Sequence, residues 1–278
     1  MRWLTLSPVS VQTILRTIYL PRSSPFPPSA SPPPPLPTDA NSALASVRIV
    51  ERPGLNNSTG QRLWDCAIGL TAYLSRHPAA LWPTVGSDGP AEPPNKRLKR
   101  SRPLQVVELG AGCGLVGIVA ARLLSGLGAA GEVVCTDVEA TVTTTLQETL
   151  DFNSSTSAPN SGPMLQPTAR TLDWGSYSPA ALDKALLPSS SSATATVLDR
   201  TLLGSDILYN PESHAVLLQT LLSFLRPPGQ IGSIRSKCLI AYKARTDGDD
   251  AFFGLAREKG LEVREVWRWG QVGVWQFS

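Results

Sequence analysis

The sequence predicts an α/β domain in which a mostly parallel β-sheet carries helices on both faces and ends in an antiparallel hairpin. Apolar runs of strand length alternate with amphipathic segments of helix length, which is typical of strand–helix–strand crossovers. A glycine-rich turn joins one of these strands directly to the next helix. The last two strands meet near Gly270 with almost no connection, and this spacing predicts the hairpin.

The individual elements follow from the same patterns. Strands are expected at residues 104–109, 132–136, 168–173, 198–205, 237–242, 262–268 and 272–277. Helices are expected at residues 61–75, 114–126, 139–152, 211–225 and 249–259. The fourth of these helices has Asn210 as its N-cap and Pro211 at its first position, and Gly260 ends the last helix.

Composition divides the chain into two parts. In residues 1–45, the segment Pro21–Pro37 is mostly proline and serine and cannot bury enough apolar surface to offset its ordering entropy, so we expect a disordered extension. Residues 46–278 suffice for one α/β domain, because the chain of 278 residues is 42% apolar. Loop insertions are expected near 77–102, 154–167 and 188–196.

The first 22 residues leave three interpretations open. Met1 to Arg22 contains arginines but no acidic residue, and its apolar segment Val9 to Leu20 has the composition of a mitochondrial transit peptide. A flexible extension is a second interpretation, and a strand that pairs with the edge of the domain is the third.

Charge and cysteine usage exclude several classes of protein. The formal net charge of +3 implies no extended surface for nucleic acid, so no direct nucleic-acid binding is expected. The four cysteines, at 66, 113, 135 and 238, contain no C-x-x-C pair, which favours buried reduced thiols over a metal site or a disulfide framework. No apolar run reaches the length of a membrane span. We therefore expect a cytoplasmic protein without a metal ion.

One basic segment bears on localisation. Lys96–Arg100 lies in the first predicted loop insertion and is flanked by further basic residues. It is interpreted either as a nuclear import signal or as a solvated basic loop.

The glycine-rich turn follows Glu108 and has glycine at 110, 112, 114 and 117. Glycine permits the backbone angles of such a turn and a close approach to a ligand. A dinucleotide fingerprint would need glycine where Leu115 stands, and a phosphate-binding loop would need lysine after Gly117. The remaining E-x-G-x-G-x-G pattern resembles motif I of class I S-adenosylmethionine-dependent methyltransferases, and a turn that binds no cofactor is the alternative.

Two further strand ends carry candidate cofactor residues, since ligands of open α/β sheets bind at the carboxyl ends of the strands. Asp137 ends the second strand and is predicted to accept the ribose hydroxyls of an adenosyl group or to cap the following helix. Trp174 follows the third strand and is predicted to lie against adenine or to pack in the core.

The fourth strand ends in residues that suit an amine acceptor. A lysine ammonium has an ordinary pKa near ~10.4, so its deprotonation at pH 7 costs roughly 4 to 5 kcal/mol. Desolvation and a nearby sulfonium charge would lower that pKa. Asp206 and Tyr209 could then orient the amine. The alternative makes Asp206 a turn former and Tyr209 a wall residue.

These motifs together are similar to those of the seven-strand protein lysine methyltransferases that act on non-histone targets, the methyltransferase-like 21 and fungal elongation factor methyltransferase family. The similarity rests on the D-x-x-Y motif Asp206–Tyr209 and on Gly60–Ala67, which is similar to G-x-x-x-W-D-A-A. The segment Leu239–Phe253 is similar to a fungal member that methylates translation elongation factor 1-alpha. The resemblance covers roughly residues 46 to 278, and it implies a Rossmann-like class I methyltransferase sheet of seven strands.

Carried over by position, the resemblance implies S-adenosyl-L-methionine as cofactor and a lysine of a protein, possibly elongation factor 1-alpha, as acceptor; we expect a monomer. Asp206 and Tyr209 become the catalytic residues. The implied cofactor-binding residues are Trp64, Gly110, Ala111, Gly112, Asp137, Trp174 and Ser205. Two positions depart from the family pattern, because Ser205 and Cys66 stand where alanine is common.

Two other classes stay open. A methyltransferase of another protein, a small molecule or RNA would keep the glycine loop, although an amino-group enzyme of nucleic acids would more typically show Asn-Pro-Pro-Tyr/Phe in place of Asp206–Tyr209. A non-catalytic module would keep the fold and lose the cofactor residues. A hydrolase is disfavoured because neither histidine, His77 or His214, lies beside a nucleophile motif.

Overall fold

The computed structural model describes residues 13–19, 46–55, 59–83, 103–154, 164–175, 198–226, 234–245 and 250–278. The expectations for Pro21–Pro37, the basic segment 96–100 and the loop 188–196 lie outside these residues, as does most of the loops 77–102 and 154–167. Within the described ranges, no helix has the length and apolar character needed to cross a bilayer.

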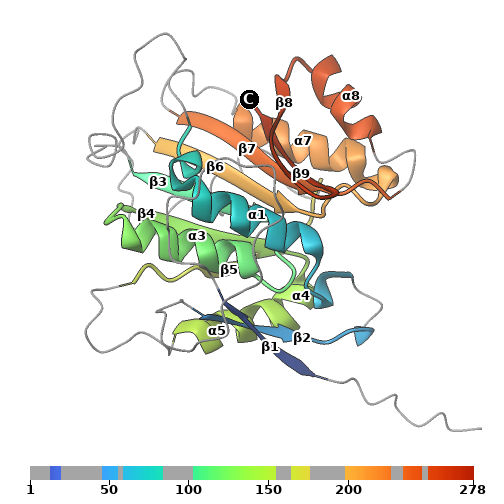
Figure 1. Ribbon diagram of the computed structural model, residues 1–278. Coiled ribbons are helices and arrows are strands. Elements are labelled where there is room, and N and C mark those ends of the chain that lie inside the picture. The colour runs from blue at the N-terminus through green and yellow to red at the C-terminus, as the bar shows by residue number, and fades with distance from the viewer. Residues whose placement is uncertain are drawn as a thin grey trace, which may run out of the picture.

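The predicted sheet is confirmed (Figure 1). Within the described residues, seven strands pair in the order β5-β4-β3-β6-β7-β9-β8. The first five in this order are mutually parallel, and β9 runs antiparallel to both β7 and β8. The strands are β3 (Leu104–Leu109), β4 (Gly131–Asp137), β5 (Thr168–Thr171), β6 (Leu198–Ser205), β7 (Ile234–Tyr242), β8 (Val263–Trp269) and β9 (Val272–Phe277).

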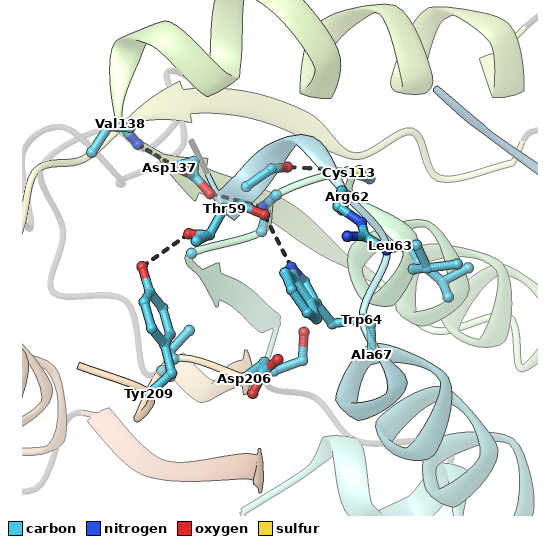
Figure 2. A pocket seen from close by; sticks show the side chains of 18 of the residues that line it. Thr59, Arg62, Leu63, Trp64, Ala67, Cys113, Asp137, Val138, Asp206 and Tyr209 are labelled. Carbon is cyan, nitrogen blue, oxygen red and sulfur yellow. Dashed lines mark hydrogen bonds between the residues drawn. The ribbon is translucent and has the colours of Figure 1, made fainter. Parts of the chain in front are cut away.

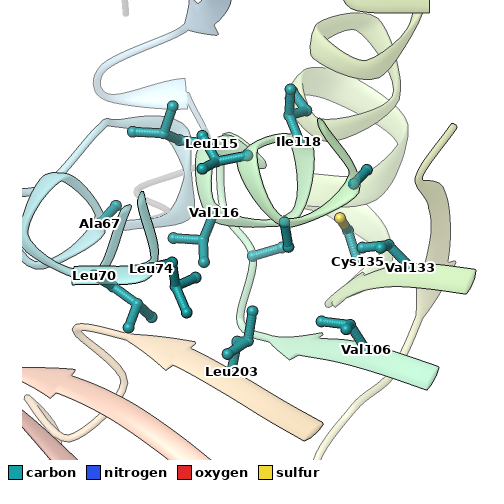
Figure 3. Packing of buried hydrophobic residues seen from close by; sticks show 14 of the residues in the cluster. Ala67, Leu70, Leu74, Val106, Leu115, Val116, Ile118, Val133, Cys135 and Leu203 are labelled. Carbon is teal, nitrogen blue, oxygen red and sulfur yellow. The ribbon is translucent and has the colours of Figure 1, made fainter. Parts of the chain in front are cut away.

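Helices cover both faces of this sheet (Figure 1). The longer ones are α1 (Asp65–Arg76), α3 (Leu115–Gly126), α5 (Gln147–Ser154), α7 (His214–Leu225) and α8 (Ala251–Glu258). Val106 of β3 packs in the cluster that includes α1 and α3, whereas its neighbour Val107 packs in the cluster that includes α7 and α8 (Figure 3). Successive side chains of a β-strand point to opposite faces of the sheet, so consecutive residues of β3 pack in two separate hydrophobic layers.

Two helix predictions needed correction at their starts. The helix predicted from residue 61 begins at Asp65, because Trp64 has extended backbone angles and a 3-10 turn, η2 (Thr59–Gln61), precedes it. The helix predicted over 211–225 opens with the 3-10 turn η5 (Pro211–Ser213), and the Asn210 side chain accepts a hydrogen bond from the Glu212 N–H at 3.2 Å, as expected of an N-cap.

The helix predicted over 139–152 is not a regular α-helix. A short turn, α4 (Glu139–Thr141), leads into the π-helical η4 (Val142–Leu146), and α5 follows. The hydroxyls of Thr143 and Thr144 donate to the carbonyls of Glu139 and Ala140, four residues earlier. Such bonds compete with the regular backbone ladder and accompany local irregularity.

A second, two-stranded sheet precedes the domain core. Strand β1 (Ile14–Tyr19) pairs antiparallel with β2 (Ser46–Glu51), which the sequence did not predict as a strand. The N–H of Val50 donates to Thr149 Oγ1 of α5 at 3.1 Å, so β2 is fixed against that helix (Figure 1). Within the first 22 residues, Ile14–Tyr19 is therefore a strand, as the third interpretation expected, but it pairs with β2 in a separate sheet and not with an edge of the seven-stranded sheet.

Helix α3 approaches the sheet very closely at Gly117. A Cβ placed there would lie 2.2 Å from Cys135 Sγ and 2.8 Å from Glu108 Oε2. The Gly117 N–H donates to Glu108 Oε2 at 2.8 Å, in an environment fully shielded from water. Glycine at 117 therefore serves the packing of α3 on β3 and β4 as well as the turn before it.

Replacing Gly117 by alanine should reduce the free energy of unfolding by about 1–3 kcal/mol, because the added methyl overpacks the α3–β4 contact. Urea unfolding monitored by circular dichroism measures this loss. Gly126→Ala, at the other end of α3, is the matched control, since a Cβ there meets no atom within 4 Å. Equal stability of the two variants would contradict the close-packing argument.

Glu108 should make stability depend on pH. Burial raises the pKa of its carboxyl from 4.5 to about 8, while the hydrogen bonds from Gly117 and Cys135 lower it. The folded state therefore holds this proton more tightly than the unfolded chain, so the contribution of Glu108 to stability is complete below about pH 4.5 and is lost as the pH rises towards about 8.

Glu108→Gln removes this titration, and its free energy of unfolding should fall less between about pH 5 and about pH 8.5 than that of the wild type. Urea unfolding at both pH values tests the difference. Glu258→Gln, an exposed change of the same kind on α8, should keep the wild-type pH dependence. An unchanged pH dependence in Glu108→Gln would show that the carboxyl titrates alike in both states.

Candidate functional site

A cavity of about 590 Å³ opens at the carboxyl ends of the central strands. Strand β3 pairs with β4 on one side and β6 on the other, so the chain leaves this point in opposite directions along the sheet. Such a switch in strand order is where open α/β sheets bind their ligands. The volume suits a cofactor-sized molecule. All nine residues named as cofactor-binding or catalytic from the sequence line this cavity, namely Trp64, Gly110, Ala111, Gly112, Asp137, Trp174, Ser205, Asp206 and Tyr209.

The glycine loop forms the base of the cavity. Gly110, Gly112 and Gly114 have φ angles of +60°, +54° and +78°, which only glycine adopts without strain. A Cβ on Gly110 would lie 2.9 Å from Ile207 Cγ2, and one on Gly112 would lie 3.1 Å from the carbonyl oxygen of Gly60. Both positions thus need glycine for backbone geometry and for space.

Asp137 fastens this loop to the end of β4 (Figure 2). Its carboxylate accepts hydrogen bonds from the N–H of Gly112 and from that of Val138, each at 2.8 Å. Burial raises the pKa of the Asp137 carboxyl, and these two bonds oppose the rise. Asp137 lines the cavity and also bonds the first N–H after its own strand, so its position allows both predicted roles, ribose binding and capping of the following helix.

Trp174 and Ser205 lie on either side of the glycine loop. The Trp174 ring is partly buried and lies 3.2 Å from the place of a Gly110 Cβ, so its edge both packs against the loop and faces the cavity. Ser205 is the last residue of β6 and is partly exposed to the cavity. The predicted alternatives for Trp174, adenine contact and core packing, are compatible in this position.

The segment Thr59–Trp64 forms the opposite wall (Figure 2). Trp64 Nε1 donates to the carbonyl oxygen of Thr59 at 3.0 Å, which folds the segment back on itself. The guanidinium of Arg62 lies 5.2 Å from the centre of the Trp64 ring. Cys113 Sγ lies 3.6 Å from the carbonyl oxygen of Gly60, so this wall also contacts the glycine loop.

Asp206 has an unusual backbone and a buried charge. Among the described residues it is the one non-glycine residue with positive φ, at 61°, and its N–H donates to the carbonyl of Ala241 at 3.0 Å. The side chain is nearly inaccessible to water and forms a bidentate ion pair with Arg245, with Arg245 Nη1 2.5 Å from Oδ1. Cys66 Sγ lies 3.5 Å from the same oxygen. Asp206 therefore has the backbone of a turn residue, and its carboxylate is paired with a guanidinium.

Sequence reasoning missed the role of Arg245. Its guanidinium pairs with Asp206 and lies 5.5 Å from the centre of the Trp64 ring, so it joins two of the predicted site residues. The two partners are 39 residues apart and meet because Ser205 of β6 is in register with Ala241 of β7. The sequence did contain a signal for this ion pair, because Arg245 follows the strand β7 that neighbours β6, and Asp206 follows β6.

Tyr209 is much more exposed than Asp206, the other predicted catalytic residue, because 47% of its surface is accessible to solvent. Its hydroxyl forms a hydrogen bond of 2.9 Å with Thr59 Oγ1, and Thr59 was not singled out from the sequence (Figure 2). The bond joins the end of β6 to the wall that contains Trp64. Tyr209 therefore lines the cavity, where both of its predicted roles are available to it.

Two cysteines contact the cavity, Cys113 in its lining and Cys66 at Asp206, whereas neither histidine lines it. All four cysteines are buried and free, as predicted. Burial, with the negative charge of Glu51 next in importance, raises the pKa of the Cys113 thiol to about 12, so it stays protonated at neutral pH. His214 Nε2 lies 3.0 Å from the carbonyl oxygen of Leu208, and the His77 ring packs 5.0 Å from that of Tyr73.

Comparison with known proteins places this geometry in a family. The family model described as lysine methyltransferase matches residues 45–259. The chain is 30% identical over 210 residues to protein N-lysine methyltransferase METTL21A of Mus musculus, an alignment that covers 73% of this chain and 69% of that protein.

Solved structures give a more distant likeness. The METTL16 methyltransferase domain has a TM-score of 0.44 at 11% identity and covers 78% of this chain and 84% of that one. The human methyltransferase 10 domain containing protein has a TM-score of 0.43 at 11% identity, with coverages of 78% and 82%. The family model covers most of the chain, including every residue of the cavity described above, and the chain therefore belongs to the lysine methyltransferase family.

Proposed function

We propose that this protein transfers the methyl group of S-adenosyl-L-methionine to the side-chain amine of a lysine in another protein. The observation that carries the proposal is that a single cavity unites the glycine loop and Asp137 with Asp206 and Tyr209. The first group suits an adenosyl cofactor and the second suits an amine. Membership of the lysine methyltransferase family and the likeness to a protein N-lysine methyltransferase support the same reaction.

The cavity residues fit the proposed cofactor. The main chain of Gly110, Ala111 and Gly112 lines the cavity, and the Asp137 carboxylate retains acceptor capacity beyond its two N–H partners. Trp174 and the exposed side chain of Val138 offer apolar surface for an adenine ring. When bound, the cofactor supplies a methyl group activated by a positively charged sulfur.

The acceptor end of the cavity suits an amine that must lose its proton. A lysine ammonium with an ordinary pKa near ~10.4 gives up its proton more easily in an apolar site beside positive charge. Trp64 supplies the apolar wall, and the Arg245 guanidinium supplies a positive charge 5.5 Å from its ring. Because Arg245 neutralises Asp206, the carboxylate can accept an N–H bond without strongly favouring the ammonium form.

Orientation is then the main contribution of the protein to the reaction. Asp206 is held by its ion pair and by a backbone bond to Ala241, and Tyr209 is held by Thr59. Groups fixed in this way can align an amine lone pair with little loss of entropy at the moment of reaction.

The identity of the substrate is the finer part of the proposal. Translation elongation factor 1-alpha is our candidate, supported by the similarity of Leu239–Phe253 to the corresponding segment of a fungal enzyme that methylates it. We further propose a monomeric, cytoplasmic enzyme whose catalytic domain spans residues 46–278. A small molecule or RNA as acceptor is the competing assignment, which would keep the cofactor half of the cavity.

Asp206→Asn should lower kcat/KM for methyl transfer by about 100-fold or more, because it removes the charge balance that orients the amine. Its dissociation constant for S-adenosylhomocysteine should change less than about threefold. Single-turnover assays and isothermal calorimetry measure the two quantities. Glu212→Gln, an exposed acidic change on η5, is the matched control and should retain full activity. Retained activity in Asp206→Asn would remove the assigned role.

Incubation of the protein with tritiated S-adenosyl-L-methionine and a fungal cell lysate should label a protein band. Digestion of that band is expected to place the label on lysine, and purified elongation factor 1-alpha should be labelled in a parallel reaction. Label in RNA or in small molecules with none in protein would overturn the proposed acceptor. Label in a different protein would overturn only the elongation factor assignment.

A further inference from the structure

We propose that Arg16, on the N-terminal strand β1, positions the wall of the cofactor cavity through Glu51 and thereby determines cofactor affinity. The proposal rests on the proposed function in one respect, namely that the ligand of the cavity is S-adenosyl-L-methionine. Its structural part concerns a chain of contacts from β1 to the segment Thr59–Trp64.

The first contact is an ion pair between the two N-terminal strands. Arg16 Nε lies 2.7 Å from Glu51 Oε2, and the two residues belong to β1 and β2, which pair along their whole length. Glu51 is 1% exposed, whereas about half of the Arg16 side chain reaches solvent. A carboxylate buried to this degree is costly without a cation. Within the described part of the chain, Arg16 is the cation that Glu51 has.

The second contact joins Glu51 to the cavity wall. The other carboxylate oxygen, Oε1, accepts the N–H of Leu63 at 2.8 Å. The next backbone position adds a second tie, because the Arg52 N–H donates to the carbonyl of Gln61 at 2.9 Å. Leu63 stands directly between Arg62 and Trp64, and all three line the cavity (Figure 2).

The wall in turn touches the glycine loop. The carbonyl oxygen of Gly60 lies 3.1 Å from the place of a Gly112 Cβ and 3.6 Å from Cys113 Sγ. The charges of Glu51 and Arg16 also act on the pKa of the Cys113 thiol, with Glu51 raising it and Arg16 lowering it. The ion pair is therefore close enough to the loop for a change at β1 to alter the cavity.

Arg16→Met keeps the length of the side chain and removes its charge, which leaves Glu51 buried without a cation. The carboxylate can then gain relief only by moving towards water or by taking up a proton, and either change weakens its bond to Leu63. We expect the dissociation constant for S-adenosylhomocysteine to rise about five- to tenfold, at the low end of the usual range for coupling between two sites.

The double variant separates this role from simple strand pairing. Glu51→Gln retains an oxygen for the Leu63 N–H and needs no cation, so alone it should change the dissociation constant less than about twofold. Added to Arg16→Met, it should restore the affinity. Arg48→Met is the matched control. Arg48 is an exposed arginine on β2 of the same strand pair, so its replacement should leave the dissociation constant unchanged.

The experiment has two readouts on the full chain. Hydrogen exchange of the ligand-free protein should show faster exchange at Gln61–Trp64 in Arg16→Met and wild-type exchange in the double variant. Calorimetry with S-adenosylhomocysteine should show the matching loss and recovery of affinity. Unchanged exchange and affinity in Arg16→Met, or a loss that Glu51→Gln does not repair, would overturn the proposal.

The same readouts keep the two proposals apart. If the wild-type protein fails to bind S-adenosylhomocysteine but exchange changes as expected, the cofactor assignment fails and the positional role of Arg16 in the wall stands. If binding is normal in the wild type and in Arg16→Met alike, the cofactor assignment stands and the role of Arg16 fails.

Discussion

The parallel pairing of β3 with both β4 and β6 is the constraint on which the rest of the site depends. Because all three strands end at the same edge, the glycine loop, Asp137 and Asp206 meet there although up to 96 residues separate them along the chain. The Asp137 carboxylate then fixes the loop to β4 through the Gly112 N–H. A change that shifted β3 by one residue would separate both halves of the cavity at once.

Paired side chains hold Asp206, Tyr209 and Trp64 in place at the cavity. Asp206 is bonded by Arg245 and Tyr209 by Thr59, and Trp64 lies beside two guanidinium groups. An arrangement of this kind limits the reorganisation that catalysis requires, since the polar groups already point into the cavity.

The sequence was most informative where a local pattern determines the structure. The strands of the main sheet, the glycine turn at 110–117 and the cap at Asn210 all follow from short-range rules of spacing and residue type. The same rules missed β2, although Pro53 and Gly54 follow it closely, and they missed the π-helical turn at Val142–Leu146, which is accompanied by threonine hydroxyls that bond to the backbone.

The site shows the same division. Nine of the residues that line the cavity were predicted from the sequence, because each belongs to a recognisable motif or strand end. The partners Arg245 and Thr59 were not predicted, because each bond joins segments that the folded sheet brings together. Spacing along the chain carries no record of such long-range contacts.

The four buried cysteines give the fold a set of internal reporters. One lies on α1, one in the glycine loop, one on β4 and one on β7, and none is accessible or in a disulfide. Because a thiol reacts as its thiolate, a buried and protonated thiol is inert until its own element opens. Alkylation followed by mass spectrometry would therefore report the opening of each layer of the molecule separately, from native residues and without any engineered label.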